Sequence, residues 1–246
     1  MNAPLALRAA LVTGGGTGIG RAIALALGGA GAAVAVNYSR SRADAEDTAQ
    51  TIRSRGGRAI AVQADVSIEN DVERLVRRVA GEFGRLDILV NNAGTTAFID
   101  YRALDALDAA TWDRIFAVNV KGAFFCARAA SRVMAEGRIL NIGSVAGITG
   151  KGSSIAYASS KGALHTMTKS LARTLAPRIT VNAIAPGVID TPWHRGREGQ
   201  IARVVQSFPI PRAGRPEDIA HIALALVAAN SYITGQVIVV DGGMLL

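Results

Sequence analysis

The chain has 246 residues, of which half are hydrophobic, and its formal net charge is +8. This length suits one α/β domain with a substantial core, and no proline-rich or single-charge stretch marks a linker, so we expect one domain over residues 1–246. The basic residues are scattered rather than gathered into runs, which argues against nucleic-acid recognition. No apolar stretch approaches the ~20 residues of a membrane span, so we expect no membrane partner.

The first residues lack the charged and apolar pattern of a secretion signal, so we expect a cytoplasmic protein. The one cysteine, Cys126, excludes an internal disulfide and suits a reducing compartment. None of His165, His194 and His221 has metal-ligand spacing to another histidine or to the cysteine, so we expect no metal site. His165 and His221 fall in expected helices and are interpreted as structural.

Short apolar runs alternate with amphipathic stretches along the whole chain. The runs predict strands at 9–12, 33–36, 59–62, 88–90, 139–142, 180–185 and 237–240. The stretches between them predict helices at 21–27, 41–55, 68–83, 111–134, 157–176 and 216–229. This alternation predicts an α/β fold, a doubly wound parallel (Rossmann) sheet with helices on both faces.

The first expected strand runs directly into a glycine-rich segment, Thr-Gly-Gly-Gly-Thr-Gly-Ile-Gly at 13–20, and a helix follows. Glycine permits positive φ and lets phosphates approach the backbone closely, and a helix N-terminus attracts anions. The pattern is therefore typical of a turn that binds a dinucleotide pyrophosphate. A glycine-rich turn alone also occurs in proteins that bind no nucleotide.

Tyr157 and Lys161 are four positions apart, which places both side chains on one face of a helix. An ammonium group beside a phenol is expected to lower its pKa from ~10 toward the working range of an acid–base catalyst. Ser144 follows an expected strand and could hold a carbonyl oxygen beside the tyrosine. By itself the Tyr-x-x-x-Lys spacing fits an ordinary helix surface better than a catalytic pair.

Further motifs follow in a fixed order. They are Asn-Asn-Ala-Gly at 91–94, Asn119, Ser144, the Tyr157 and Lys161 pair, Pro-Gly-Val-Ile-Asp-Thr at 186–191 and Asp-Gly-Gly at 241–243. With the glycine turn, they make the chain resemble the short-chain dehydrogenase/reductase family over nearly its whole length. The resemblance extends in particular to 3-oxoacyl-acyl-carrier-protein reductases and to related sugar and alcohol dehydrogenases. It implies an NAD(P)-dependent enzyme acting on CH–OH groups, and a homotetramer.

The resemblance also implies residue roles. Tyr157 would be the general acid, Lys161 would lower its pKa and bind the nicotinamide ribose, and Ser144 would orient the substrate oxygen. Asn119 would hold a water that links Lys161 to solvent. The implied cofactor-binding residues are Gly14, Thr17, Gly18, Ile19, Asn37, Ser39, Arg40, Asp65, Val66, Asn92, Ala93, Gly94, Tyr157, Lys161, Pro186, Gly187, Ile189 and Thr191.

Cofactor preference depends on the end of the second expected strand. An acidic residue there would bind the ribose hydroxyls of NAD, but no carboxylate occurs before Asp44. Asn37 is neutral, and Arg40 or Arg42 could pair with a 2′-phosphate. We therefore expect NADP(H), with NAD(H) as the alternative if both arginines are merely solvated.

The segment at about 190–208 is expected to be the loop over the substrate. It contains Trp193, His194 and several arginines, which suit a substrate with an apolar body and an anionic or hydroxylated part. We expect interconversion of a ketone and a secondary alcohol, similar to 3-oxoacyl-thioester reduction, with acyl carrier protein as a candidate partner. The alternatives are an NAD(P)-dependent sugar, polyol or other alcohol dehydrogenase, and a non-catalytic nucleotide-binding regulator.

Overall fold

The structure is a computed structural model that describes residues 3–228 and 232–246. Seven parallel strands form one sheet in the order β3-β2-β1-β4-β5-β6-β7. They are β1 Ala9–Val12, β2 Ala33–Tyr38, β3 Ala59–Gln63, β4 Ile88–Asn91, β5 Gly137–Ile142, β6 Ile179–Pro186 and β7 Val237–Val240. Every expected strand is present, and the doubly wound α/β prediction is confirmed. The strand order reverses between β1 and β4, where this type of sheet binds its ligands.

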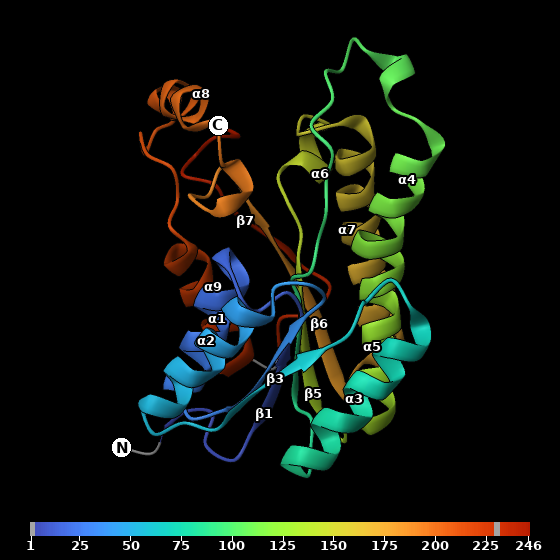
Figure 1. The fold of residues 1–246 in the computed structure, drawn as a ribbon, viewed down its shortest axis with the longest axis vertical. Helices are drawn as coiled ribbons and strands as arrows, with labels where there is room; N and C mark the ends of the chain where they lie inside the picture. The colour runs from blue at the N-terminus through green and yellow to red at the C-terminus, as the bar shows by residue number, and fades with distance from the viewer. Residues whose placement is uncertain (1–2, 229–231) are drawn as a thin grey trace.

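Helices cover both faces of the sheet (Figure 1). The α-helices are α1 Gly18–Gly29, α2 Arg42–Ser54, α3 Glu69–Phe83, α4 Ala109–Phe116, α5 Ala123–Val133, α6 Ala146–Thr149, α7 Ile155–Leu175, α8 Glu198–Val204 and α9 Pro216–Ala228. One face carries α1, α2 and α9, and the other carries α3, α5 and α7. The last position of the expected helix 216–229 lies outside the described residues.

The two-sided burial explains the unbroken apolar runs in the sequence. Ala10 and Val12 of β1 join the core cluster beneath α1, α2 and α9, whereas Leu11 joins the cluster beneath α3, α5 and α7. Cys126 of α5 lies fully buried in the second cluster, and burial raises its pKa to about 12. The cysteine is therefore a packing residue.

The expected helix 111–134 is not one regular helix. A π-helical turn, Ala117–Gly122, separates α4 from α5. Such turns insert an extra residue into a helix and often lie at functional sites. Here the turn carries Asn119, whose contacts are described below.

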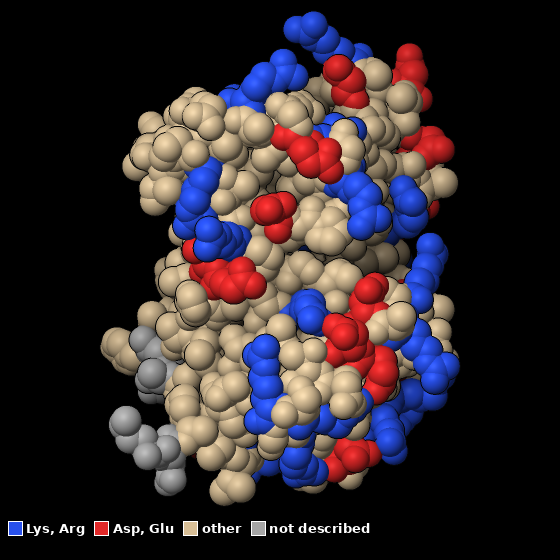
Figure 2. Space-filling model, turned by 60° about the vertical axis from the view of Figure 1, so that its left-hand side comes forward, with Lys and Arg blue, Asp and Glu red and all other residues tan. Residues whose placement is uncertain are grey.

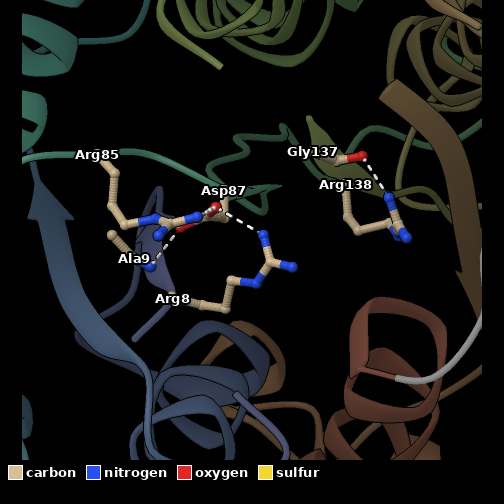
Figure 3. Close-up of polar contacts among 6 residues, drawn as sticks. All are labelled: Arg8, Ala9, Arg85, Asp87, Gly137 and Arg138. Atoms are coloured by element: carbon tan, nitrogen blue, oxygen red, sulfur yellow. Dashed lines mark hydrogen bonds and ion pairs between the residues drawn. The ribbon is translucent and has the colours of Figure 1, made fainter. Parts of the chain in front are cut away.

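The amino ends of β1 and β4 are joined through one buried carboxylate, Asp87 (Figure 3). It accepts hydrogen bonds from Arg8 at 3.0 Å, from the Ala9 backbone at 2.8 Å and from Arg85 at 2.8 and 2.7 Å. Burial alone would raise the pKa of Asp87, but these hydrogen bonds outweigh it and lower the pKa. The carboxylate thereby fixes the base of the sheet at the end opposite to the glycine turn.

The surface carries both signs of charge. Figure 2 shows basic and acidic side chains interspersed over the face in view. Within the described ranges, no helix combines the length and apolar character needed to cross a membrane.

Candidate active site

A cavity of about 1140 Å³ lies at the carboxyl ends of the parallel strands. Its walls come from the segments that follow β1 to β6, together with α7 and the segment after Thr191. Every residue of the expected cofactor set lines this cavity, and so do Ser144, Trp193 and His194. Of the expected catalytic residues only Asn119 lies outside the cavity wall. The fold thus gathers into one space residues that are spread over most of the sequence.

The glycine turn is held against the end of β4 by Thr13. Its buried hydroxyl accepts hydrogen bonds from the backbone N–H groups of Asn92 and Ala93, both at 3.0 Å, and donates to the Val90 carbonyl at 3.2 Å. The Asn92 side chain donates in return to the carbonyls of Thr13 and Gly14, both at 3.0 Å. The Asn-Asn-Ala-Gly motif therefore fixes the shape of the turn.

The turn fits a pyrophosphate on two structural grounds. Gly14 and Gly18 have φ of 60° and 51°, and a Cβ at Gly20 would lie 2.3 Å from the Gly14 carbonyl oxygen, so glycine is required. In addition, α1 begins at the cavity wall, and its N-cap residue Thr17 makes no side-chain capping bond. Its first N–H groups are therefore left for an anionic ligand.

At the end of β2 the structure distinguishes the two candidate arginines. Arg40 lines the cavity, whereas Arg42, the first residue of α2, does not. Asn37 is buried, and its amide donates to the Val62 and Ala64 carbonyls at 3.2 and 3.1 Å, which holds β2 to the end of β3. The neutral Asn37 together with Arg40 suits a ribose 2′-phosphate better than a free ribose 2′-hydroxyl.

Three side chains from β5 and α7 form the expected proton-transfer group. Ser144 follows β5 and is hydrogen-bonded to Tyr157, while Lys161 lies one helical turn further along α7. The Lys161 ammonium lies 5.7 Å from the centre of the Tyr157 ring and donates to the Ile142 carbonyl at 2.7 Å. Ser154 caps α7 by accepting from the Tyr157 backbone N–H at 3.3 Å.

Burial controls the protonation of this group. It raises the pKa of Tyr157 to about 12, and the hydrogen bond with Ser144, which acts in the opposite direction, does not compensate. Burial also lowers the pKa of Lys161 to about 8. The prediction that the pKa of Tyr157 is lowered is therefore wrong for this arrangement: desolvation raises it by more than Ser144 lowers it, and the Lys161 ammonium donates to the Ile142 carbonyl. Tyr157 keeps its proton at neutral pH and is prepared to act as an acid.

Asn119 lies behind the cavity wall and is 2% exposed. Its side chain accepts from the Thr95 N–H at 2.8 Å and donates to the Thr95 carbonyl and to the Ser160 hydroxyl, both at 3.0 Å. The Ser160 hydroxyl in turn donates to the Tyr157 carbonyl at 2.7 Å. The amide thus links the segment after β4 to α7, and its expected water-holding role stays a prediction.

Comparison with known proteins agrees with this geometry. A family model described as enoyl-(acyl carrier protein) reductase matches residues 14–245. The protein described as ketoacyl reductase 2 of the granaticin polyketide synthase of Streptomyces violaceoruber is 44% identical over 240 residues, which cover 95% of this chain and 94% of that protein. A 3-oxoacyl-[acyl-carrier-protein] reductase of Synechocystis sp. is 40% identical over 248 residues, covering 98% of each chain.

A solved structure shows the same fold. A short chain dehydrogenase from Burkholderia cenocepacia, crystallised in complex with NADP, is 38% identical and superposes with a TM-score of 0.91 over 99% of this chain and 100% of that chain. This chain belongs to the short-chain dehydrogenase/reductase family. It is an oxidoreductase acting on the CH–OH group, as the motifs predict.

The substrate half of this short-chain dehydrogenase/reductase contains residues that sequence reasoning missed. Trp193, an expected substrate contact, has its ring centre 5.9 Å from that of Tyr157. In the same cavity, the guanidinium carbon of Arg197 lies 3.8 Å from the ring centre of Phe98. Phe98 follows the Asn-Asn-Ala-Gly motif by a few positions, and that proximity was the only signal for it in the sequence.

His165 also contacts the site, although its helix position suggested only a structural role. It is 7% exposed, and its Nε2 accepts a hydrogen bond from the Ser144 backbone N–H at 3.5 Å. Burial, with the charges of Lys161 and Lys169, lowers the pKa of His165 to about 4. The imidazole is therefore neutral and supports the Ser144 turn from behind. Within the described ranges, no group of His, Cys, Asp or Glu is arranged to hold a metal ion.

Proposed function

We propose that this enzyme reduces a ketone to a secondary alcohol with NADPH, and that its substrates are similar to 3-oxoacyl thioesters. One observation carries the proposal: a single cavity joins the glycine turn, Arg40 and the Ser144–Tyr157 pair. The NADP complex of the Burkholderia cenocepacia relative and the 3-oxoacyl reductase named among the matches support it.

The chain's own groups divide the chemistry between them. The bound nicotinamide supplies the hydride. Ser144 holds the ketone oxygen by a hydrogen bond, and Tyr157 donates its proton to that oxygen as the alcohol forms. The buried Lys161 ammonium stabilises the phenolate left on Tyr157. The cofactor would be held by Gly14 and Gly18 at its pyrophosphate.

The test is a screen for NADPH consumption over 3-oxoacyl thioesters, keto acids, diketones and sugars. Turnover of a 3-oxoacyl thioester with NADPH supports the proposal. Oxidation of sugars with NAD as the best reaction would instead support the sugar dehydrogenase alternative. Absence of turnover over the whole panel would support a nucleotide-binding regulator, against which the assembled Ser144–Tyr157 pair argues, because a regulator needs no proton donor.

An acyl carrier protein is a further proposed partner. Arg173 of α7 is exposed and makes no ion pair among the described residues. Of the two arginines around the end of α5, Arg132 is bound to Glu73 at 2.8 Å, and the half-buried Arg138 donates to the Gly137 carbonyl at 2.9 Å. Of these three arginines Arg173 alone is both exposed and without an ion pair to a described residue, and we infer that carrier docking is weak.

For assembly and location, we propose a homotetramer in the cytoplasm. Phe124 and Val133 of α5 are 38% and 40% exposed, and Val239 of the edge strand β7 is 40% exposed. Apolar groups exposed on a helix and on a sheet edge are suited to contacts between subunits. Light scattering after gel filtration tests the mass, and a monomer at micromolar concentration would contradict it.

A further inference from the structure

Among the residues that line the active-site cavity outside the expected cofactor set, basic side chains outnumber acidic ones. Arg114, Lys151 and Arg197 line it, and none of them forms an ion pair with a described residue. Asp100 is the carboxylate among these lining residues, and one of its oxygens already accepts from the Arg102 N–H at 2.8 Å. Like charges that converge on one cavity favour an anionic ligand.

Arg197 differs from the other arginines of its segment. Arg195 and Arg203 are exposed and do not line the cavity, whereas Arg197 is half-buried against the ring of Phe98. Stacking occupies the flat face of the guanidinium and fixes its position, but the N–H donors lie at the edge of the group and stay free. That edge matches the two oxygens of a carboxylate or a phosphate.

The neighbouring groups are consistent with an anion at this position. Burial and the charge of Arg197 both lower the pKa of His194, so this histidine stays neutral and can donate or accept a hydrogen bond. Phe98 and Trp193, which are 41% and 37% exposed, supply apolar surface next to Arg197 and next to Tyr157, respectively.

We propose, on the basis of the proposed ketone reduction, that the substrate carries an oxyanion beyond its ketone and that the guanidinium edge of Arg197 binds it. Arg197 is then a specificity-determining residue, with Arg114 and Lys151 adding attraction at longer range. The oxyanion is a phosphate of a coenzyme-type thioester or a carboxylate of a keto acid.

The test measures binding by calorimetry in the presence of saturating NADP+, where no ketone can be reduced. Butanoyl-coenzyme A is compared with the neutral butanoyl N-acetylcysteamine thioester, and 4-oxopentanoate is compared with its methyl ester. Each pair shares its acyl or keto group and differs in negative charge. The variants are Arg197→Gln and, as the matched control from the same segment, Arg195→Gln.

We expect the wild type to bind the charged member of at least one pair roughly 10- to 100-fold more tightly than the neutral member, as for a charge-assisted contact. Arg197→Gln should remove most of that ratio, and Arg195→Gln should leave it within about twofold. The ratio should also fall as salt is added. A preference confined to the coenzyme pair identifies phosphate, and one confined to the keto acid pair identifies carboxylate.

Equal binding of charged and neutral members by the wild type would overturn the proposal, and so would a ratio that Arg197→Gln leaves unchanged. The NADPH screen separates this outcome from failure of the proposed function. Anion binding that depends on Arg197 in a protein without turnover would refute the reaction alone. Turnover without such binding would refute the oxyanion site alone.

Discussion

Tyr157 and Lys161 show how burial decides the chemistry of single side chains. The same desolvation raises the pKa of Tyr157 to about 12 and lowers that of Lys161 to about 8, because it disfavours the charged form of each group. The tyrosine is therefore a proton donor at neutral pH. The ammonium beside it compensates for the charge that the donor acquires when it reacts.

Arg40 is the residue that we expect to select the cofactor. Loss of a charge-assisted contact to a 2′-phosphate costs about 1.5–3 kcal/mol, so Arg40→Ala should weaken NADPH binding roughly ten- to a hundredfold and leave NADH binding nearly unchanged. Titration of both cofactors by fluorescence measures this. Arg42→Ala is the control, since Arg42 does not line the cavity. Equal weakening of both cofactors, or a wild-type preference for NADH, would refute the assignment.

His165 predicts a pH dependence of stability. Its pKa is lowered from 6.5 to about 4 in the folded protein, so between these pH values the unfolded chain binds a proton that the folded one does not. The contribution of His165 to the free energy of unfolding is therefore fully present above pH 6.5. It falls by about 3 kcal/mol as the pH decreases toward 4. His165→Gln should remove this part of the acid dependence, which urea unfolding at several pH values measures. An unchanged pH dependence in the variant would contradict the inference.

At the scale of elements, the Thr13 hydroxyl is one of the groups that join the glycine turn to the end of β4. Thr13→Val keeps the volume of the side chain but deprives the Ala93 N–H of its acceptor in a buried position. We expect the free energy of unfolding to fall by about 1–3 kcal/mol and NADPH binding to weaken. Thr13→Ser retains the hydroxyl and is the control. A Thr13→Val protein as stable as Thr13→Ser would show that the contact is dispensable.

The sequence predicted strands better than helix interiors and contacts. Both 9–12, which is buried on both faces, and the edge strand 237–240 are continuous apolar runs, so their bounds were predicted to the residue. The π-helical turn at Ala117–Gly122 was missed because one added residue barely disturbs helical periodicity. The stacking of Arg197 on Phe98 joins segments far apart in the chain, and no spacing rule relates them.

At the scale of the whole molecule, the parallel sheet brings the ends of six strands together at one edge, and the site is assembled there. Residues of separate short motifs, from the glycine turn to Thr191, therefore lie together around one cavity. Motif order was consequently a better guide to the site than any single motif. The prediction of a lowered pKa for Tyr157 was wrong because the pKa depends on how deeply the assembled fold buries the ring. No local sequence pattern reports that burial.

Carrier recognition is also a property of the whole surface. Charges of both signs are interspersed on the face shown in Figure 2, and the exposed Arg173 of α7 makes no ion pair with a described residue. Surface charges mainly set encounter rates and salt dependence, so free or coenzyme-linked substrates should be reduced nearly as well as carrier-bound ones. Catalytic efficiency on one 3-oxoacyl group in each form measures this. A large, salt-sensitive preference for the carrier form that Arg173→Glu abolishes would contradict the prediction.

The most direct measurement is NADPH-dependent reduction of a 3-oxoacyl thioester by the wild type and by Tyr157→Phe. The substitution removes the proton donor but keeps the ring that lies near Trp193. We expect the turnover number to fall at least ~100-fold, as when general acid catalysis is lost, while the dissociation constant for NADPH stays within about twofold. Near-normal turnover by Tyr157→Phe would show that another group donates the proton and would contradict the account.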